Sequence, residues 1–225
     1  MPGPFIAASR ELHGLTAAAE RRLLVRLAGR LPHSVHADHL TALAAAAMAA
    51  AGLLYALAPF WPPALLVVNF CLLANWFGDS LDGTLARVRG EERPRYGFYV
   101  DHVLDAAGIT LLVAGMAVSG LLSPLVAAVF LAAYLLVCVE VYLATYCLAS
   151  FRMSFAGIGP TELRLLVAAG NVSAYVDPVV RPFGVPLRLF DLGAGLGAAA
   201  LGLVFAWSAV RNGRRLFREE PRQRR

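Results

Sequence analysis

The chain reads Asp79-Ser-Leu-Asp82-Gly83-Thr-Leu-Ala86-Arg87 and, after nine further residues, Gly97-x-x-x-Asp101-x-x-x-Asp105. These two motifs place four carboxylates in sequence that is otherwise strongly apolar. At the centre of a bilayer each carboxylate would cost roughly 2.5 to 3.5 kcal/mol, so four would cost on the order of 10 kcal/mol without compensation. Bound cations would supply that compensation, and the motifs therefore predict a cation site.

The spacing of the acids predicts how they meet. On a helix, residues three or four positions apart project from one face, as Asp79 and Asp82 do, and likewise Asp101 and Asp105. Two antiparallel helices joined by a polar turn from Val88 to Tyr96 would bring both pairs to the same end. Such an oxygen-rich ligand set suits Mg or Mn, whereas zinc would favour Cys and His.

The other positions of the motifs suit a phosphorylated ligand. Gly83 directly follows Asp82, and Gly97 precedes Asp101 by four residues. Glycine lets a bulky ligand approach the backbone, and the guanidinium of Arg87 can pair with phosphate oxygens. We therefore expect a phosphate-bearing substrate beside the cation site.

Composition predicts an all-α integral membrane protein. The chain is 59% hydrophobic, above the roughly 45 to 50% of ordinary soluble domains. Six segments approach the ~20 residues that a helix needs to cross the hydrocarbon: about 40–59, 64–87, 98–121, 124–147, 160–178 and 186–210. Turn-forming clusters separate them, and no internal repeat divides the chain. Residues 1–225 are expected to form a single membrane domain.

The arginines predict the orientation of that domain. All 20 basic residues are arginine: five precede the first span, four lie in or beside the turn after the second, and seven fall in the last fifteen residues. The opposite side carries only Arg181 and Arg188. By the positive-inside rule, both termini and the carboxylate end are expected to face the cytoplasm.

Two arginine-rich segments flank the spans. In residues 15–31, Arg22, Arg26 and Arg30 recur every four positions beside a leucine-rich face, a pattern typical of an amphipathic helix in the membrane interface. Residues 211–225 form a basic cytoplasmic tail of the kind that anchors to anionic lipids. We attribute the net charge of +5 to contact with membrane lipids and expect no nucleic-acid partner.

The motifs resemble the signature of the CDP-alcohol phosphotransferase (CDP-alcohol phosphatidyltransferase) family. That signature reads D-x-x-D-G-x-x-A-R, usually eight residues, then G-x-x-x-D-x-x-x-D, and every fixed position is matched. The one departure is the gap of nine residues, which falls in the turn. The resemblance implies a six-helix phospholipid-synthesis enzyme, often a homodimer, that transfers a substituted phosphoryl group to an alcohol acceptor.

The resemblance also implies roles for the matched residues. It assigns metal binding to Asp79, Asp82 and Asp101. It assigns to Asp105 the role of proton acceptor, with an additional contact to the second metal ion. It assigns substrate binding to Gly83, Ala86, Arg87 and Gly97. Two divalent ions, Mg or Mn, would neutralise the pyrophosphate of a CDP-linked donor while an alcohol oxygen attacks the distal phosphorus and CMP leaves.

Four further residues are weaker candidates for substrate binding. Thr41 ends a segment similar to the P-N-x-x-T of relatives, although capping of the first span explains it equally well. Arg93 lies in the turn with the extra residue. Arg152 and Arg164 flank Gly159-Pro160-Thr161-Glu162, which is either ordinary helix N-terminal chemistry or part of an acceptor site.

The substrates stay open at this point. CDP-diacylglycerol is the favoured donor, but His102 beside Asp101 is similar to the amino-alcohol branch, in which CDP-choline or CDP-ethanolamine reacts with diacylglycerol. The acceptor, the choice of Mg or Mn, the oligomeric state and the role of Glu140, for which we expect a hydrogen bond to a neighbouring helix, are also open. A cation or proton transporter would explain the aspartates but not the glycines and the arginine at family positions.

Overall fold

The computed structural model describes residues 9–11, 17–152 and 159–220, and these residues are almost entirely helical. The helices are α1 (Ala17–Ala28), α2 (Ala37–Leu57), α3 (Ala64–Arg89), α4 (Pro94–Val118), α5 (Pro124–Leu148), α6 (Pro160–Val176) and α7 (Leu189–Glu219). Strand β1 (Ser9–Glu11) pairs in parallel with β2 (Ser150–Arg152), and β3 (Val179–Val180) pairs antiparallel with β4 (Leu187–Arg188) around a 3-10 helix, η1 (Pro182–Gly184).

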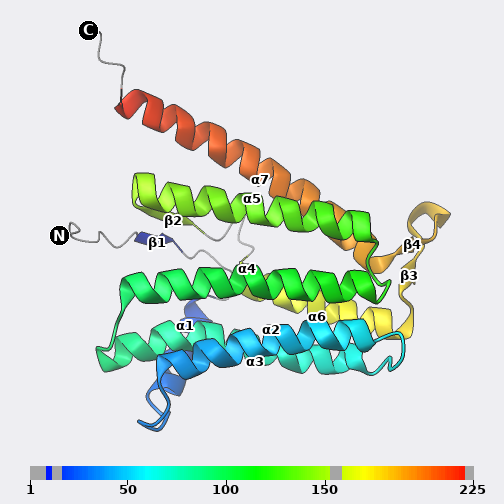
Figure 1. Ribbon diagram of the computed structural model, residues 1–225, viewed down its shortest axis with the longest axis horizontal. Coiled ribbons are helices and arrows are strands. Elements are labelled where there is room, and N and C mark those ends of the chain that lie inside the picture. Colours follow the sequence, from blue (N-terminus) through cyan, green and yellow to red (C-terminus); the bar gives the residue numbers. More distant parts are fainter. Residues whose placement is uncertain (1–8, 12–16, 153–158, 221–225) are drawn as a thin grey trace.

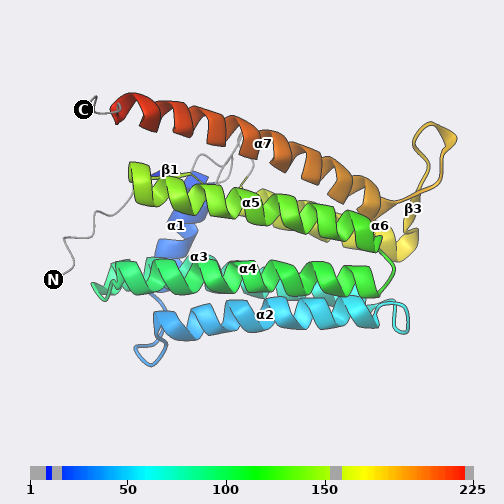
Figure 2. The same cartoon turned by 45° about the horizontal axis from the view of Figure 1, so that its top comes forward.

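Helices α2 to α7 run roughly along the long axis of the molecule and reverse direction at each connection (Figures 1 and 2), while α1 lies across them (Figure 2). Five of them, α2, α3, α4, α5 and α7, are long and apolar enough to cross a membrane. The chain is therefore an all-α integral membrane protein. The fifth predicted span corresponds to α6, which has only 17 residues and is not among those five.

The turn between α3 and α4 is shorter than predicted. Helix α3 continues to Arg89 and α4 begins at Pro94, so only four residues separate them instead of nine. Gly90 ends α3 with a φ of 68°, a left-handed conformation that glycine adopts without steric cost. Pro94 starts α4, where its missing N–H leaves no helical bond unmade.

The segment predicted as a basic tail after the last span is helical in the structure. Helix α7 runs without a break through Glu219, so residues 211–219 extend the last helix. Arginine, leucine and glutamate are good helix formers, and Arg215 forms an i,i+4 ion pair with Glu219 at 2.8 Å. The arginines of this segment are therefore held on a rigid element.

Glycines bring α2 close to both α3 and α4. A Cβ added to Gly115 of α4 would lie 2.0 Å from the carbonyl oxygen of Gly52 of α2, and one added to Gly78 of α3 would lie 2.5 Å from that of Leu40. Small residues permit such backbone contact between membrane helices. Helix α2 thus packs between α3 and α4, which make little direct contact with each other.

Helix α1 packs on the part of α3 that carries the acidic motif. Leu24 and Ala28 of α1 are buried against Leu81 and Leu85 of α3. The helix spans residues 17–28 rather than the predicted 15–31, and its arginines Arg21, Arg22 and Arg26 are exposed. One amphipathic helix therefore covers α3 and exposes basic side chains.

Candidate functional site

The four aspartates lie on two helices near the short turn that joins them. Asp79 and Asp82 belong to α3, and Asp101 and Asp105 belong to α4. The charges of Asp79, Asp82 and Asp101 all act on the carboxyl group of Asp105. The fold thus brings the two pairs into one electrostatic site. Contacts of α2 with both α3 and α4 hold these two helices in place.

Asp82 is buried, whereas the other three aspartates are partly exposed. Its side chain is buried, with 6% of the residue exposed. The hydroxyl of Thr41 on α2 donates to its Oδ2 at 2.7 Å, and the backbone N–H of Gly83 donates to its Oδ1. Thr41, a weak candidate from sequence, therefore contacts a predicted metal ligand and fixes the direction of its carboxylate.

Asp79 pairs with a cation from another helix. Arg164 of α6 donates from Nη2 to Asp79 Oδ2 at 2.6 Å and from Nε to Asn75 Oδ1 at 2.9 Å. Asn75 is buried and donates in turn to the carbonyl oxygen of Ala44 on α2 at 3.2 Å. The side chains of Arg164 and Asp79 are 18% and 31% exposed, so the pair is shielded from solvent in part.

The predicted substrate positions differ in the space around them. A Cβ added to Gly83 would contact the guanidinium of Arg87, with Nη1 at 3.4 Å and Nη2 at 3.9 Å, and one added to Gly97 would meet no described atom within 4 Å. Arg87 is exposed and donates from Nη2 to the hydroxyl of Thr84 at 3.1 Å. Ala86 is half-buried beside it. Gly97 thus borders open space, whereas Gly83 faces the flexible side chain of Arg87.

The remaining arginine candidates differ in position. Arg93 is exposed, pairs with Asp38 at the start of α2 and stacks over the ring of Tyr96 at 4.3 Å. It ties the α3–α4 turn to α2. Arg152 belongs to β2, and its side chain lies outside the described residues.

The structure shows the contacts of His102 and Glu140, whose roles the sequence left open. The ring of His102 is buried between Phe98 of α4, with centroids 4.2 Å apart, and Tyr142 of α5, at 4.9 Å. Glu140 of α5 accepts a hydrogen bond from Asn212 of α7 at 2.7 Å. The expectation that Glu140 bonds a neighbouring helix is confirmed.

Sequence reasoning missed Glu20, a half-buried acid on α1. Its carboxylate accepts hydrogen bonds from Trp76 Nε1 at 2.6 Å, from Ser80 Oγ at 3.4 Å and from Thr161 Oγ1 at 3.2 Å. These donors lie on α3 and α6, and Ser80 adjoins Asp79. The sequence signal for Glu20 was that it is a single acid in an arginine-rich helix. Asn75 was also missed, and its signal was a polar residue one helical turn before Asp79.

The donor set fits hard divalent cations. Among the described residues, no three His, Cys, Asp or Glu side chains converge closely enough to enclose an ion in the observed arrangement. The site nevertheless gathers four carboxylates, which are ligands that Mg and Mn prefer. In addition, the guanidinium of Arg164 forms a partly buried ion pair with Asp79. These side chains are of a type that could serve as oxygen ligands of a divalent cation.

Comparison with known proteins identifies the chain by family. Residues 34–204, well over half of the chain, match the family described as CDP-alcohol phosphatidyltransferase. The match contains all four aspartates and their partners on α2 and α6, whereas α1 and the end of α7 lie outside it. No curated protein matched the sequence. Members of this family are transferases of substituted phosphate groups, which favours a transferase over a transporter.

Proposed function

Because this chain belongs to the CDP-alcohol phosphatidyltransferase family and is therefore a transferase of substituted phosphate groups, we propose that it moves a phosphatidyl group from CDP-diacylglycerol to an alcohol acceptor. CMP is the second product, and the reaction serves phospholipid synthesis. The observation that carries the proposal is the placement of four aspartates on α3 and α4 of a membrane bundle, with Asp82 buried and Asp79 paired with Arg164.

The metal site follows from the donor chemistry. Asp79, Asp82, Asp101 and Asp105 would hold two divalent ions, Mg or Mn. Bound ions would neutralise the pyrophosphate of the donor and the CMP that leaves. Thr41 supports this assignment, because its hydrogen bond directs the carboxylate of Asp82, and such partners of metal ligands tune both orientation and affinity.

Asp105 is the proposed base. It would accept the proton of the acceptor hydroxyl as that oxygen forms a bond to the distal phosphorus and the bond from phosphorus to the CMP oxygen breaks. The CDP moiety would lie against Gly83, Ala86, Arg87 and Gly97, of which Gly97 borders open space. Arg164, with its guanidinium at Asp79, would hold acceptor or donor phosphate oxygens.

The proposal includes a membrane arrangement. Helix α6 would be the sixth span, because it continues the alternation of directions seen from α2 to α7 (Figure 1). Its 17 residues reach about 25 Å, and a local thinning of the bilayer accommodates such a span. Both termini and the aspartates would face the cytoplasm, with α1 in the interface, and two chains would form a homodimer.

The test uses purified protein with Mg and two sets of substrates. CDP-diacylglycerol is supplied with glycerol phosphate, inositol phosphate or serine, and CDP-choline or CDP-ethanolamine is supplied with diacylglycerol. We expect CMP and a new phospholipid only from CDP-diacylglycerol with one of its acceptors. CMP formed only from the soluble donors would overturn the donor assignment, and no CMP in any mixture would overturn the proposed reaction.

A further inference from the structure

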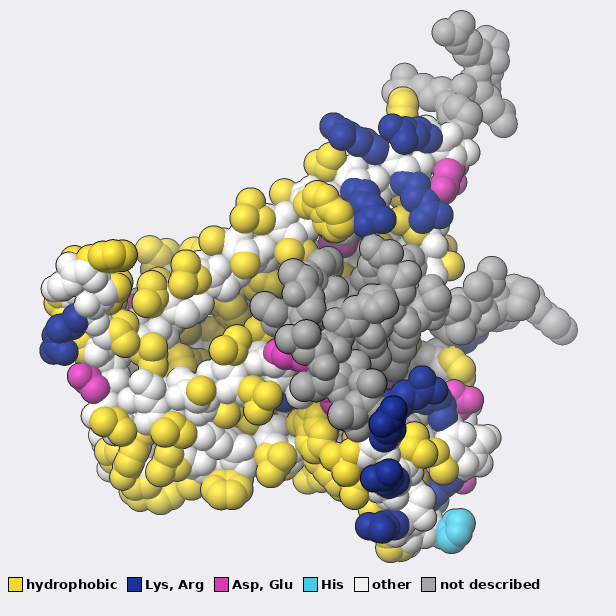
Figure 3. Space-filling view, turned by 180° about the vertical axis from the view of Figure 1, so that it is seen from behind, with side chains coloured by type: hydrophobic (Ala, Val, Ile, Leu, Met, Phe, Trp, Pro, Cys, Tyr) yellow, Lys and Arg dark blue, Asp and Glu magenta, His cyan; other side chains and the backbone are white. Residues whose placement is uncertain are grey.

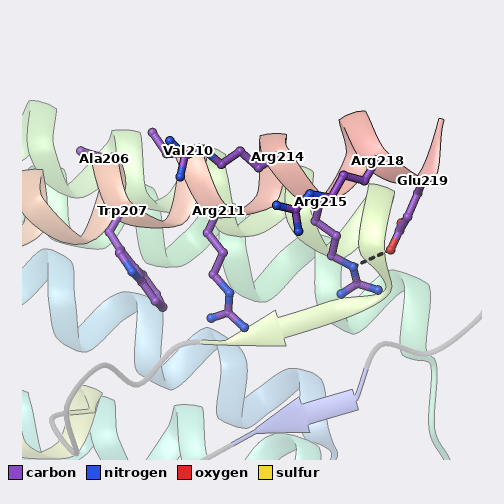
Figure 4. A pocket seen from close by; sticks show the side chains of 8 residues that line it. All are labelled: Ala206, Trp207, Val210, Arg211, Arg214, Arg215, Arg218 and Glu219. Carbon is purple, nitrogen blue, oxygen red and sulfur yellow. Dashed lines mark hydrogen bonds and ion pairs between the residues drawn. The ribbon is translucent and has the colours of Figure 1, made fainter. Parts of the chain in front are cut away.

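A basic groove runs along the end of α7, away from the aspartates. It encloses about 690 Å³, and its described lining comes entirely from this helix: Ala206, Trp207, Val210, Arg211, Arg214, Arg215, Arg218 and Glu219 (Figure 4). We call this the arginine groove. Figure 3 shows that the arginines of α7 lie toward the same end of the molecule as a second basic cluster, with only a small basic spot at the other end.

The length of α7 places the arginine groove at a defined depth. The helix has 31 residues, about 46 Å, whereas the hydrocarbon core is about 30 Å thick and is crossed by about 20 residues. Counted from Leu189, the hydrocarbon therefore ends near Trp207 to Val210. Trp207 is 56% exposed, as expected of an aromatic residue at the membrane–water boundary. The four arginines lie in the next turns, at the level of the lipid headgroups.

Contacts with α5 fix which face of α7 is exposed. Ser208 is buried, and Asn212, one turn further, donates to Glu140 of α5 at 2.7 Å. Because Ser208 and Asn212 face α5, the adjacent face of α7 is exposed. Trp207 and Arg211 lie on that face and line the groove, with the Arg211 guanidinium 5.0 Å from the Trp207 ring. The groove is thus oriented by a hydrogen bond within the bundle.

The charge of the arginine groove is one-sided. Its one acid among the described lining residues, Glu219, pairs with Arg215 at 2.8 Å. Within the described part of the chain, no ion pair involves Arg211, Arg214 or Arg218. Three guanidinium groups therefore face the headgroup layer without an internal counter-charge, which suits a ligand with phosphate oxygens.

We propose that the arginine groove binds the headgroup of an anionic phospholipid from the surrounding leaflet. Arg211, Arg214 and Arg218 contact the phosphate, and the Trp207 ring packs beside the glycerol and upper acyl region. A lipid fits better than a soluble phosphate, because the groove starts at the hydrocarbon boundary and combines an exposed indole with the arginines. The residues that line the groove follow residue 204, where the family match ends, and we assign to them a lipid that is not itself transformed.

The test is native mass spectrometry of the full-length protein in a neutral detergent, titrated with phosphatidylglycerol or phosphatidylcholine. We expect one saturable phosphatidylglycerol adduct that phosphatidylcholine does not replace. Replacing Arg211, Arg214 and Arg218 together by Gln should weaken that adduct on the order of 100-fold, since each arginine near an anionic surface contributes about a factor of five. Release of CMP by this variant should stay at the wild-type level, which also shows that it is folded.

The matched control replaces Arg21, Arg22 and Arg26 of α1, which are exposed, by Gln and should leave the saturable adduct intact. Equal loss in both variants would show attraction by general surface charge and overturn a built site. Displacement of the lipid by inorganic phosphate would overturn the choice of a lipid over a soluble phosphate. Equal binding of both lipids would overturn the assignment to an anionic headgroup.

Discussion

Replacement of Thr41 by Val tests whether α2 directs a metal ligand. Valine keeps the shape of threonine but removes the hydroxyl that donates to Asp82 Oδ2 at 2.7 Å. Asp82 is buried, so water cannot fully replace the lost donor. The carboxylate would then be free to turn away from the direction in which it meets an ion.

The expected size of the effect follows from the type of bond. A hydrogen bond to a charged, buried group contributes about 1.5 to 3 kcal/mol, and loss of a partner of a metal ligand typically lowers metal affinity about 10- to 100-fold. We therefore expect Thr41→Val to raise the Mg concentration for half-maximal activity by about 10- to 100-fold. The rate at saturating Mg should fall much less.

The assay measures CMP release against Mg concentration for wild type, Thr41→Val and Thr41→Ser. Serine retains the hydroxyl, so its Mg dependence should stay close to wild type. If Thr41→Val needs no more Mg than wild type, the hydrogen bond does not serve a metal ligand. An equal defect in Thr41→Ser would point to packing of the methyl group instead.

Three further predictions concern the metal, α1 and the helix packing. EDTA should abolish CMP release and Mg or Mn should restore it; full activity after exhaustive metal removal would contradict the two-ion site. Glu20→Ala should lower the thermal stability of the detergent-solubilised protein by about 1 to 3 kcal/mol because it leaves three donors unpaired, whereas Glu20→Gln, which keeps an acceptor oxygen, should lose less; equal losses would argue against these bonds. Gly115→Ala should prevent α2 and α4 from packing, because its Cβ would lie 2.0 Å from a backbone oxygen, whereas Gly202→Ala meets nothing within 4 Å; size-exclusion chromatography should show aggregation of the first variant only.

The helices were predictable because long apolar runs and clear breaks mark them. The predicted spans 64–87 and 124–147 match α3 (Ala64–Arg89) and α5 (Pro124–Leu148) closely. The end of α7 was missed because residues 211–219, of which four are arginine, resemble a solvated basic tail. The strands β1 to β4 have two or three residues each and carry no alternation from which to predict them.

The site was predictable at the level of residue type and less so at the level of contacts. Spacing alone put Asp79 with Asp82 on one helix face. It could not show that Thr41 reaches Asp82 or that Arg164 reaches Asp79, since these partners are 41 and 85 residues apart. Nor could it show that α2 contacts both α3 and α4, because a local motif does not encode which helices are neighbours in space. These contacts depend on glycines that let the helix backbones approach closely.

The most direct test of the central claim compares Asp105→Asn with Asp82→Ala in one experiment that measures binding of the CDP-linked donor by calorimetry and the rate of CMP release. A base that is only a secondary metal ligand can be neutralised without loss of binding, so Asp105→Asn should bind the donor nearly normally and lose about 10² to 10⁴-fold in rate. Asp82→Ala should lose both binding and rate, with partial recovery at high Mg. Near-normal turnover of Asp105→Asn, or normal donor binding and rate in Asp82→Ala, would contradict the proposed site.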